Sequence, residues 1–200
     1  DLSDVNNIKK NVIKVVQSKF ETVDILVVNS GGPKPGTFFD LSEDDWNSSY
    51  DSVLNYVIKL YEYIIPIMKQ SKWGRIINIT SLSVKEPAES LVLSNVFRSA
   101  IVSLSKTISR ELIKHNITIN NVCPGAFKTD RAIELMNKRS KKTGETVEDI
   151  ELQAVKSLPL GRYQDPSELG ALVAFLSSQQ ARGITGTTVQ IDGGIYKGIF

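Results

Sequence analysis

The chain has 200 residues, of which 41% are hydrophobic, and a formal net charge of +2 at pH 7. This composition suits one globular domain with a sizeable core over residues 1–200, and the mild charge argues against a nucleic-acid-binding protein. The one basic cluster, residues 138–142, has acidic residues nearby and no aromatic residue within it, as on a solvated surface. No apolar run reaches the length of a membrane span.

The single histidine and the single cysteine restrict the chemistry further. His115 alone cannot build a histidine-rich metal site, and we expect no metal. Cys123 excludes an internal disulfide and fits a reducing compartment, so we expect a cytoplasmic protein.

The first third of the chain predicts a helix, a strand and a second helix. Apolar residues recur at helical spacing over residues 5–20, and the apolar run 24–29 is typical of a buried parallel strand. The strand ends in Asn29-Ser30-Gly31-Gly32, where glycines let backbone approach a ligand closely; an ordinary glycine turn is the alternative. The second helix follows, with Ser42 as its N-cap.

Residues 74–125 predict one βαβ unit around which the rest of the chain is arranged. A buried strand spans residues 75–80, a long helix spans 91–116, and a second strand spans 118–123. Two strands joined in this way lie parallel, with a right-handed crossover. Ligands of such sheets bind beyond the carboxyl ends of the strands, so we expect the site between Ser81 and the loop 124–130.

Several segments of the chain resemble the short-chain dehydrogenase/reductase family. They are Gly74-Arg75-Ile76-Ile77-Asn78-Ile79-Thr80-Ser81, Leu104-Ser105-Lys106-Thr107-Ile108-Ser109-Arg110-Glu111-Leu112, Ile119-Asn120-Asn121-Val122-Cys123-Pro124-Gly125, and the closing Thr185-Gly186 and Asp192-Gly193-Gly194. The resemblance covers essentially the whole chain and implies a doubly wound, Rossmann-like parallel α/β sheet. It also implies that residues 131–158, which predict two helical pieces around Thr143-Gly144, form a substrate lid.

One part of the family pattern is missing. A dinucleotide-binding fold begins with a strand, a glycine-rich turn and a helix whose N-terminus receives the diphosphate. No Gly-x-x-x-Gly-x-Gly or Gly-x-Gly-x-x-Gly precedes Asp24. We therefore expect this sequence to lack the first two βα units and to be the C-terminal part of a longer chain. The alternative is a short form that covers its open sheet edge by oligomerising.

The resemblance implies NAD or NADP as cofactor and a set of residues that contact it. Asn29, Ser30 and Gly31 would lie against the adenosine half, and Asp1 would border the adenine. After Pro124 and Gly125, Thr129 stands where the family's threonine contacts the carboxamide or the diphosphate. Arg98 would hold ribose hydroxyls. The choice between NAD and NADP stays open.

The same resemblance locates the catalytic positions. Ser81 falls on the family's catalytic serine. The family's tyrosine and lysine follow at 13 and 17 residues, where this chain has Ser94 and Arg98. The family's asparagine position, seven residues after Trp46, holds Val53. A serine hydroxyl cannot replace a phenol as acid unaided, whereas Arg98 can stabilise an alkoxide but cannot relay protons.

Lys85, with Glu86 beside it, follows Ser81 in the loop on the substrate side of the family's cleft. A solvated loop pair is one interpretation of these two residues. A lysine desolvated there, serving as acid or base, is the other.

Three functions remain open from the sequence. The resemblance favours an NAD(P)-dependent oxidoreductase acting on a small-molecule carbonyl/alcohol pair, similar to 3-oxoacyl reductases. The lost tyrosine and lysine favour a degenerate relative that binds a nucleotide or a partner without turnover, and a structural oligomer subunit is the third possibility. The family pairs through the helices here at residues 46–71 and 91–116, so we expect a homodimer or homotetramer.

Overall fold

A computed structural model describes residues 7–8 and 12–199. Its centre is a parallel sheet of four strands in the order β1-β2-β3-β4. The strands span Ile25–Val28, Gly74–Ile79, Ile117–Pro124 and Thr188–Ile191. The predicted parallel α/β architecture is therefore confirmed. Asp1, which the sequence assigns to the adenine, lies outside the described residues.

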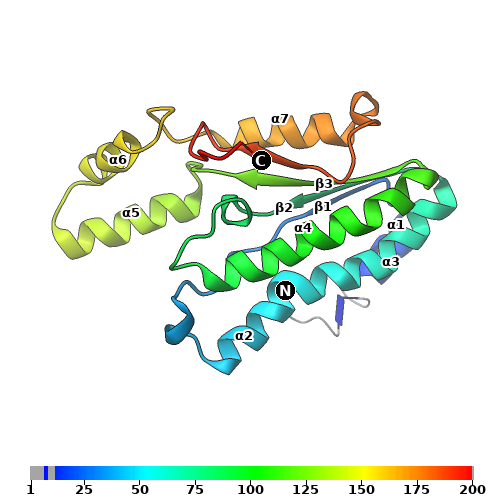
Figure 1. The fold of residues 1–200 in the computed structure, drawn as a ribbon, viewed down its shortest axis with the longest axis horizontal. Coiled ribbons are helices and arrows are strands. Elements are labelled where there is room, and N and C mark those ends of the chain that lie inside the picture. The colour runs from blue at the N-terminus through cyan, green and yellow to red at the C-terminus, as the bar shows by residue number, and fades with distance from the viewer. Residues whose placement is uncertain (1–6, 9–11, 200) are drawn as a thin grey trace.

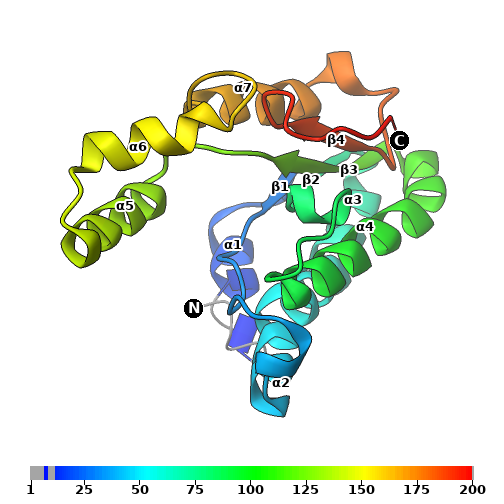
Figure 2. The ribbon, with the colours of Figure 1, turned by 60° about the vertical axis from the view of Figure 1, so that its left-hand side comes forward.

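Helices cover the two faces of this sheet (Figures 1 and 2). Their bounds are Lys14–Lys19 for α1, Glu43–Ser49 for α2, Tyr56–Ser71 for α3, Val92–Leu112 for α4, Asp130–Thr143 for α5, Val147–Lys156 for α6 and Pro166–Ser177 for α7. Helices α1, α3 and α4 pack on one face and α7 on the other, whereas α5 and α6 form a hairpin that projects past the carboxyl end of β3 (Figure 1). Among the described residues, no helix is long and apolar enough to cross a membrane.

Two hydrophobic clusters hold the layers together. The larger one joins α3 and α4 to the sheet, with fully buried Met68, Ile76 and Ile119 among its members. The smaller one packs Leu176 of α7 against Ile77 on the opposite face of the sheet. Because both faces are covered, every residue of β2 and of β3 except the last is buried, polar Asn78, Asn120 and Asn121 included.

Strand β1 differs from its neighbours because it forms an edge of the sheet. Its four residues are all apolar, as in a buried strand, yet Ile25 is 47% exposed and Val27 is 45% exposed. Both lie on the face that α7 covers further along the sheet, because side chains alternate along a strand. An open apolar edge strand can pair with other chains and cause aggregation. The two upstream βα units expected from the sequence would cover this edge, and they stay a prediction.

Local sequence signals account for most helix ends. The predicted cap is confirmed, since the Ser42 hydroxyl accepts the Asp45 N–H and Asp45 receives the Ser42 N–H in return. The second predicted helix is not uniform, because a π-helical turn, Tyr50–Asn55, joins α2 to α3. Helix α4 ends at Leu112, four residues before the predicted end, and a 3₁₀ turn leads to Asn116 with φ +59°.

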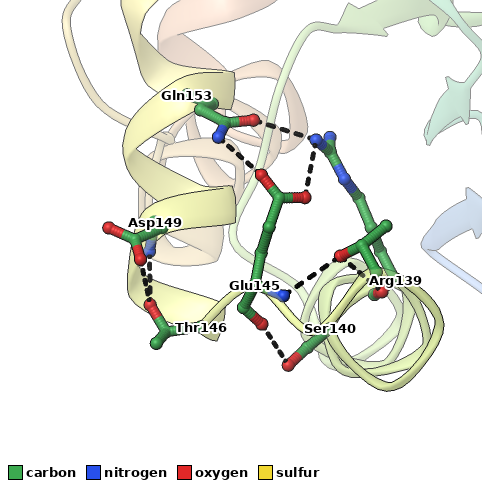
Figure 3. Close-up of polar contacts among 7 residues, drawn as sticks. Arg139, Ser140, Glu145, Thr146, Asp149 and Gln153 are labelled. Carbon is green, nitrogen blue, oxygen red and sulfur yellow. Dashed lines mark hydrogen bonds and ion pairs between the residues drawn. The ribbon is translucent and has the colours of Figure 1, made fainter.

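The α5–α6 hairpin turns where the sequence predicts. Gly144 ends α5 with φ +78°, a conformation that favours glycine. Glu145 then ties the two helices together, accepting hydrogen bonds from Arg139 at 3.3 Å and Gln153 at 2.7 Å, while the Ser140 hydroxyl donates to its backbone carbonyl (Figure 3). The hairpin is thus braced by its own polar side chains.

Candidate functional site

Ser81 lies two residues after the end of β2 and lines two pockets at the carboxyl end of the sheet. We name them the inner pocket, of about 250 Å³, and the loop pocket, of about 550 Å³. The inner pocket is lined by Gly32, Pro33, Lys34, Pro35, Thr80, Ser81, Leu91, Ser94, Arg98 and Arg131. The loop pocket is lined by Ser81, Leu82, Ser83, Glu86, Pro87, Ala88, Leu91, Ser157, Pro159, Ile195 and Lys197. Ser81 and Leu91 belong to both, so ligands in the two pockets would meet at Ser81.

Three serines lie together at this wall. The Ser81 hydroxyl accepts the Ser83 N–H at 3.1 Å, and the Ser83 and Ser94 hydroxyls are 3.3 Å apart. Ser94 comes from the first turn of α4 and is 6% exposed. The structure thus brings together the two serines that the sequence places 13 residues apart, and adds Ser83, which the sequence did not suggest.

Arg98 fixes α4 against the strand ends. Its Nη1 donates to the carbonyls of Ile79 at 3.0 Å and Thr80 at 3.2 Å, and its Nη2 donates to the Gly31 carbonyl at 3.2 Å. A guanidinium has five N–H donors, so two of those of Arg98 make no hydrogen bond within the described residues. Within the described residues no carboxylate forms an ion pair with Arg98, although the side chain is only 6% exposed.

The charge of Arg98 is retained despite its burial. Desolvation lowers the pKa of the guanidinium, and the nearby Tyr56 and Cys123 oppose that effect. A guanidinium starts from a pKa above about 12, so Arg98 stays protonated at neutral pH. The site therefore contains a fixed positive charge beside two serine hydroxyls.

Tyr56 is a site residue that the sequence analysis missed. It is 2% exposed, and burial raises the pKa of its hydroxyl while a hydrogen bond with Ser30 and the charge of Arg98 act the other way. Val53, at the family's asparagine position, is instead buried in the core. The asparagine two residues later, Asn55, donates its amide N–H to Asp51 at 2.8 Å. Tyr56 follows Val53 by three residues, but Val53 lies in the π-helical turn Tyr50–Asn55 that precedes α3, so the spacing along the sequence did not indicate it.

Lys85 is not among the residues that line either pocket. It caps the short 3₁₀ turn Leu82–Val84. Its charge acts on the buried Cys123, whose pKa is raised by desolvation and lowered in part by Thr80 and Lys85. The role of Lys85 as acid or base therefore stays a prediction.

The residues predicted to bind the cofactor fall into two groups. At the end of β1, Asn29 and Gly31 are exposed, Ser30 is half-buried, and a Cβ built on Gly31 would have no heavy atom within 4 Å. That open backbone, with the spare donors of Arg98 behind it, suits the hydroxyls and the flat rings of a nucleoside. This half of the site therefore fits a nicotinamide cofactor, whose diphosphate-binding turn is not in the sequence.

The second group lies in the loop after β3, where Gly125 and Thr129 each make contacts that stabilise the fold. Gly125 follows Pro124 and has no room for a side chain, because a Cβ there would lie 2.6 Å from the Cα of Asp192. Thr129 caps α5, its hydroxyl accepting the Ala132 N–H at 3.2 Å. These contacts explain the two residues without a ligand, so their cofactor roles stay predictions.

Comparisons with known proteins agree with this geometry. A family model described as Enoyl-(Acyl carrier protein) reductase matches residues 1–196. The NADPH-dependent reductase BacG of Bacillus subtilis is 32% identical over 199 residues, which cover 100% of this chain and 76% of that protein. The 3-oxoacyl-[acyl-carrier-protein] reductase FabG of Staphylococcus epidermidis is 31% identical, with 94% and 72% covered. The crystal structure of L-sorbose reductase from Gluconobacter frateurii, complexed with NADPH and L-sorbose, has a TM-score of 0.94 at 26% identity, with 100% and 76% covered.

Proposed function

Since the chain belongs to the short-chain dehydrogenase/reductase family, we propose that it is an NAD(P)-dependent oxidoreductase acting on a carbonyl/alcohol pair. The observation that carries the proposal is Ser81, which lies between two pockets with the charge of Arg98 behind it. Together the two pockets offer space for a nucleotide at the open end of β1 and for a small molecule beside Ser81.

The residues of the chain would act on the carbonyl oxygen. The cofactor, when bound, supplies or accepts the hydride. Ser81 and Ser94 can donate hydrogen bonds to the oxygen, and Arg98 can stabilise the negative charge that develops on it. In a closed site such preorganised donors are the main source of rate enhancement. The proton then comes from a serine hydroxyl acting with water, because Ser94 stands at the position of the family's tyrosine.

Lys85 is the other candidate proton donor. It follows Ser81 by four residues in a half-buried loop, but it lines neither pocket. We therefore rank it below the two serines.

The names of the relatives indicate the substrate class. They include an NADPH-dependent reductase and a 3-oxoacyl-[acyl-carrier-protein] reductase. For this chain we propose reduction of a small ketone or a 3-oxoacyl compound, with NADPH preferred over NADH, in the cytoplasm.

A second candidate function is binding without turnover. It is favoured by one observation, that Ser94 and Arg98 replace the tyrosine and lysine of the family's usual pattern. Such a protein would bind the cofactor but transfer no hydride.

Initial rates of NADPH and NADH oxidation test the proposal. Wild type is compared with the double variant Ser94→Tyr, Arg98→Lys on a panel of 3-oxoacyl thioesters and small ketones. We expect turnover by wild type and a retained or raised rate in the double variant. A silent wild type with an active double variant would establish the degenerate alternative.

We also propose that the chain pairs with a second copy. Helices α3 and α4 form an apolar groove between them, lined by Ile58, Tyr61, Glu62, Ile65, Pro66, Leu104 and Ile108. Light scattering should give a dimer or tetramer at micromolar concentration, and a monomer would contradict this expectation.

A further inference from the structure

The inner pocket contains more positive charge than its surroundings neutralise. Three cations line it, Lys34, Arg98 and Arg131, and no aspartate or glutamate does. Lys34 is paired with Asp45 at 2.7 Å. For Arg98 and Arg131, the part of the chain that the structure describes offers no carboxylate within ion-pair distance.

The two arginines approach the pocket from different elements. Arg98 belongs to α4 and is held by strand carbonyls, whereas Arg131 belongs to the first turn of α5. The Nη1 of Arg131 lies 3.7 Å from the position that a Cβ on Gly32 would take, so its guanidinium reaches across to the loop after β1. The pocket is thus spanned by two guanidinium groups.

Helix stability does not account for Arg131. The N-terminal turn of a helix carries a partial positive charge, so a cation there is unfavourable. Asp130 in the same turn complements the helix, but no ion pair between Asp130 and Arg131 occurs within residues 12–199. The charge of Arg131 helps to lower the pKa of Glu134, but that carboxylate is paired with Lys138 at 2.6 Å. A guanidinium that lines a pocket and has no ion pair in the described part of the chain is available to a ligand.

The chemistry of this pocket selects an oxyanion. Guanidinium groups bind carboxylates and phosphates through paired, charge-assisted hydrogen bonds. A pocket lined by charge of one sign also raises the local concentration of the opposite charge. Neutral ketones would leave both charges uncompensated.

We propose that Arg131 binds a carboxylate or phosphate oxyanion of the substrate, which makes the substrate an oxo acid rather than a neutral ketone. Ser81 and Ser94 line the same pocket, so a carbonyl next to the acidic group reaches their hydroxyls. The small side chain of Ser94 leaves room there. Arg98 adds its charge from the opposite wall. This inference rests on the proposed function, because it names the substrate of the same site.

Matched acids and esters test the proposal. We would measure kcat/KM at saturating NADPH for 2-oxobutanoate and acetoacetate and for their methyl esters. A hydrogen bond to a charged group contributes about 1.5–3 kcal/mol. The acid-to-ester ratio should therefore fall about 10- to 100-fold in Arg131→Gln. Arg131→Lys should keep part of the preference, and Arg110→Gln, an exposed arginine of α4, should keep all of it.

An unchanged ratio in Arg131→Gln would overturn the proposal. A loss of NADPH affinity in that variant with the ratio unchanged would also overturn it, because the oxyanion would then belong to the cofactor. If no ketone is turned over at all, calorimetry with oxalate decides. If the Kd for oxalate rises at least about tenfold in Arg131→Gln and not in Arg110→Gln, the oxyanion site is supported although the reductase activity is not. An absence of oxalate binding to wild type overturns the site.

Discussion

Helix α4 and the α5–α6 hairpin approach the site from opposite sides and are built differently. Ser94 and Arg98 of α4 are each 6% exposed, and backbone carbonyls at and just beyond the ends of β1 and β2 fix Arg98 in place. In the hairpin, Met136 of α5 and Ile150 of α6 are the buried residues, and its braces are mostly its own polar side chains (Figure 3). A wall anchored to the sheet suits charge stabilisation, which needs fixed geometry. A hairpin anchored mainly to itself suits substrate selection.

Substitutions in α4 should have the largest effect on kcat. Arg98→Ala removes the fixed charge and should lower kcat about 10²- to 10³-fold. Initial rates of NADPH oxidation would measure the loss, with Arg110→Ala on the exposed side of α4 as the control and circular dichroism as the check on folding. If Arg98→Ala is folded and keeps the full rate, α4 contributes no more to catalysis than the hairpin, and this account is wrong.

Ser81→Ala should follow, with a loss of about 10² in kcat. The hydroxyl lies on the wall that both pockets share, so its removal takes one donor from the carbonyl oxygen. Ser103→Ala, on the exposed surface of α4, is the matched control. An equal loss in both variants would show that the effect is not specific to the hydroxyl of Ser81.

Tyr56→Phe should have a smaller effect, on cofactor binding. Losing one hydrogen bond costs about 1 kcal/mol, so the Kd for NADPH should rise about fivefold by fluorescence titration. Burial raises the pKa of Tyr56 above its usual value near 10.0, so the hydroxyl is protonated and neutral below that pH. The ratio of the two Kd values should thus be constant between about pH 6 and about pH 9. A change in that ratio, or an equal effect of Tyr50→Phe, would contradict this role.

The hairpin should give the smallest effect. Glu145→Ala removes the acceptor that Arg139 and Gln153 share, and should raise KM a few-fold with kcat unchanged. Glu148→Ala, an exposed neighbour, should leave both constants as they are. A fall in kcat in Glu145→Ala would show that the hairpin takes part in the chemistry.

The sequence predicted those features that depend on neighbours along the chain. The apolar run 24–29 and the βαβ unit 74–125 predicted the first three parallel strands, Ser42 predicted the start of α2, and Gly144 predicted the turn of the hairpin. The spacing of 13 and 17 residues after Ser81 was enough to bring Ser94 and Arg98 to the same pocket, because a helix after a strand fixes where its first turns lie.

Features that depend on packing could not be predicted. Tyr56 reaches Ser30 because a π-helical turn and the core orient α3, and neither is visible in the spacing of residues. The cofactor role of Gly125 stays a prediction, but nothing in the sequence indicated its close approach to Asp192, 67 residues away. Arg131 had no signal in the sequence, because its approach to Gly32 depends on how the start of α5 lies beside the loop after β1.

Transfer of deuterium tests the central claim most directly. The protein would be incubated with NADPH carrying deuterium at C4 of the nicotinamide and with a small oxo acid, and the alcohol would be analysed by mass spectrometry. Our account predicts one deuterium on the carbinol carbon, and a much lower yield from Arg98→Ala at equal protein concentration. Cofactor binding without any deuterated alcohol would contradict it.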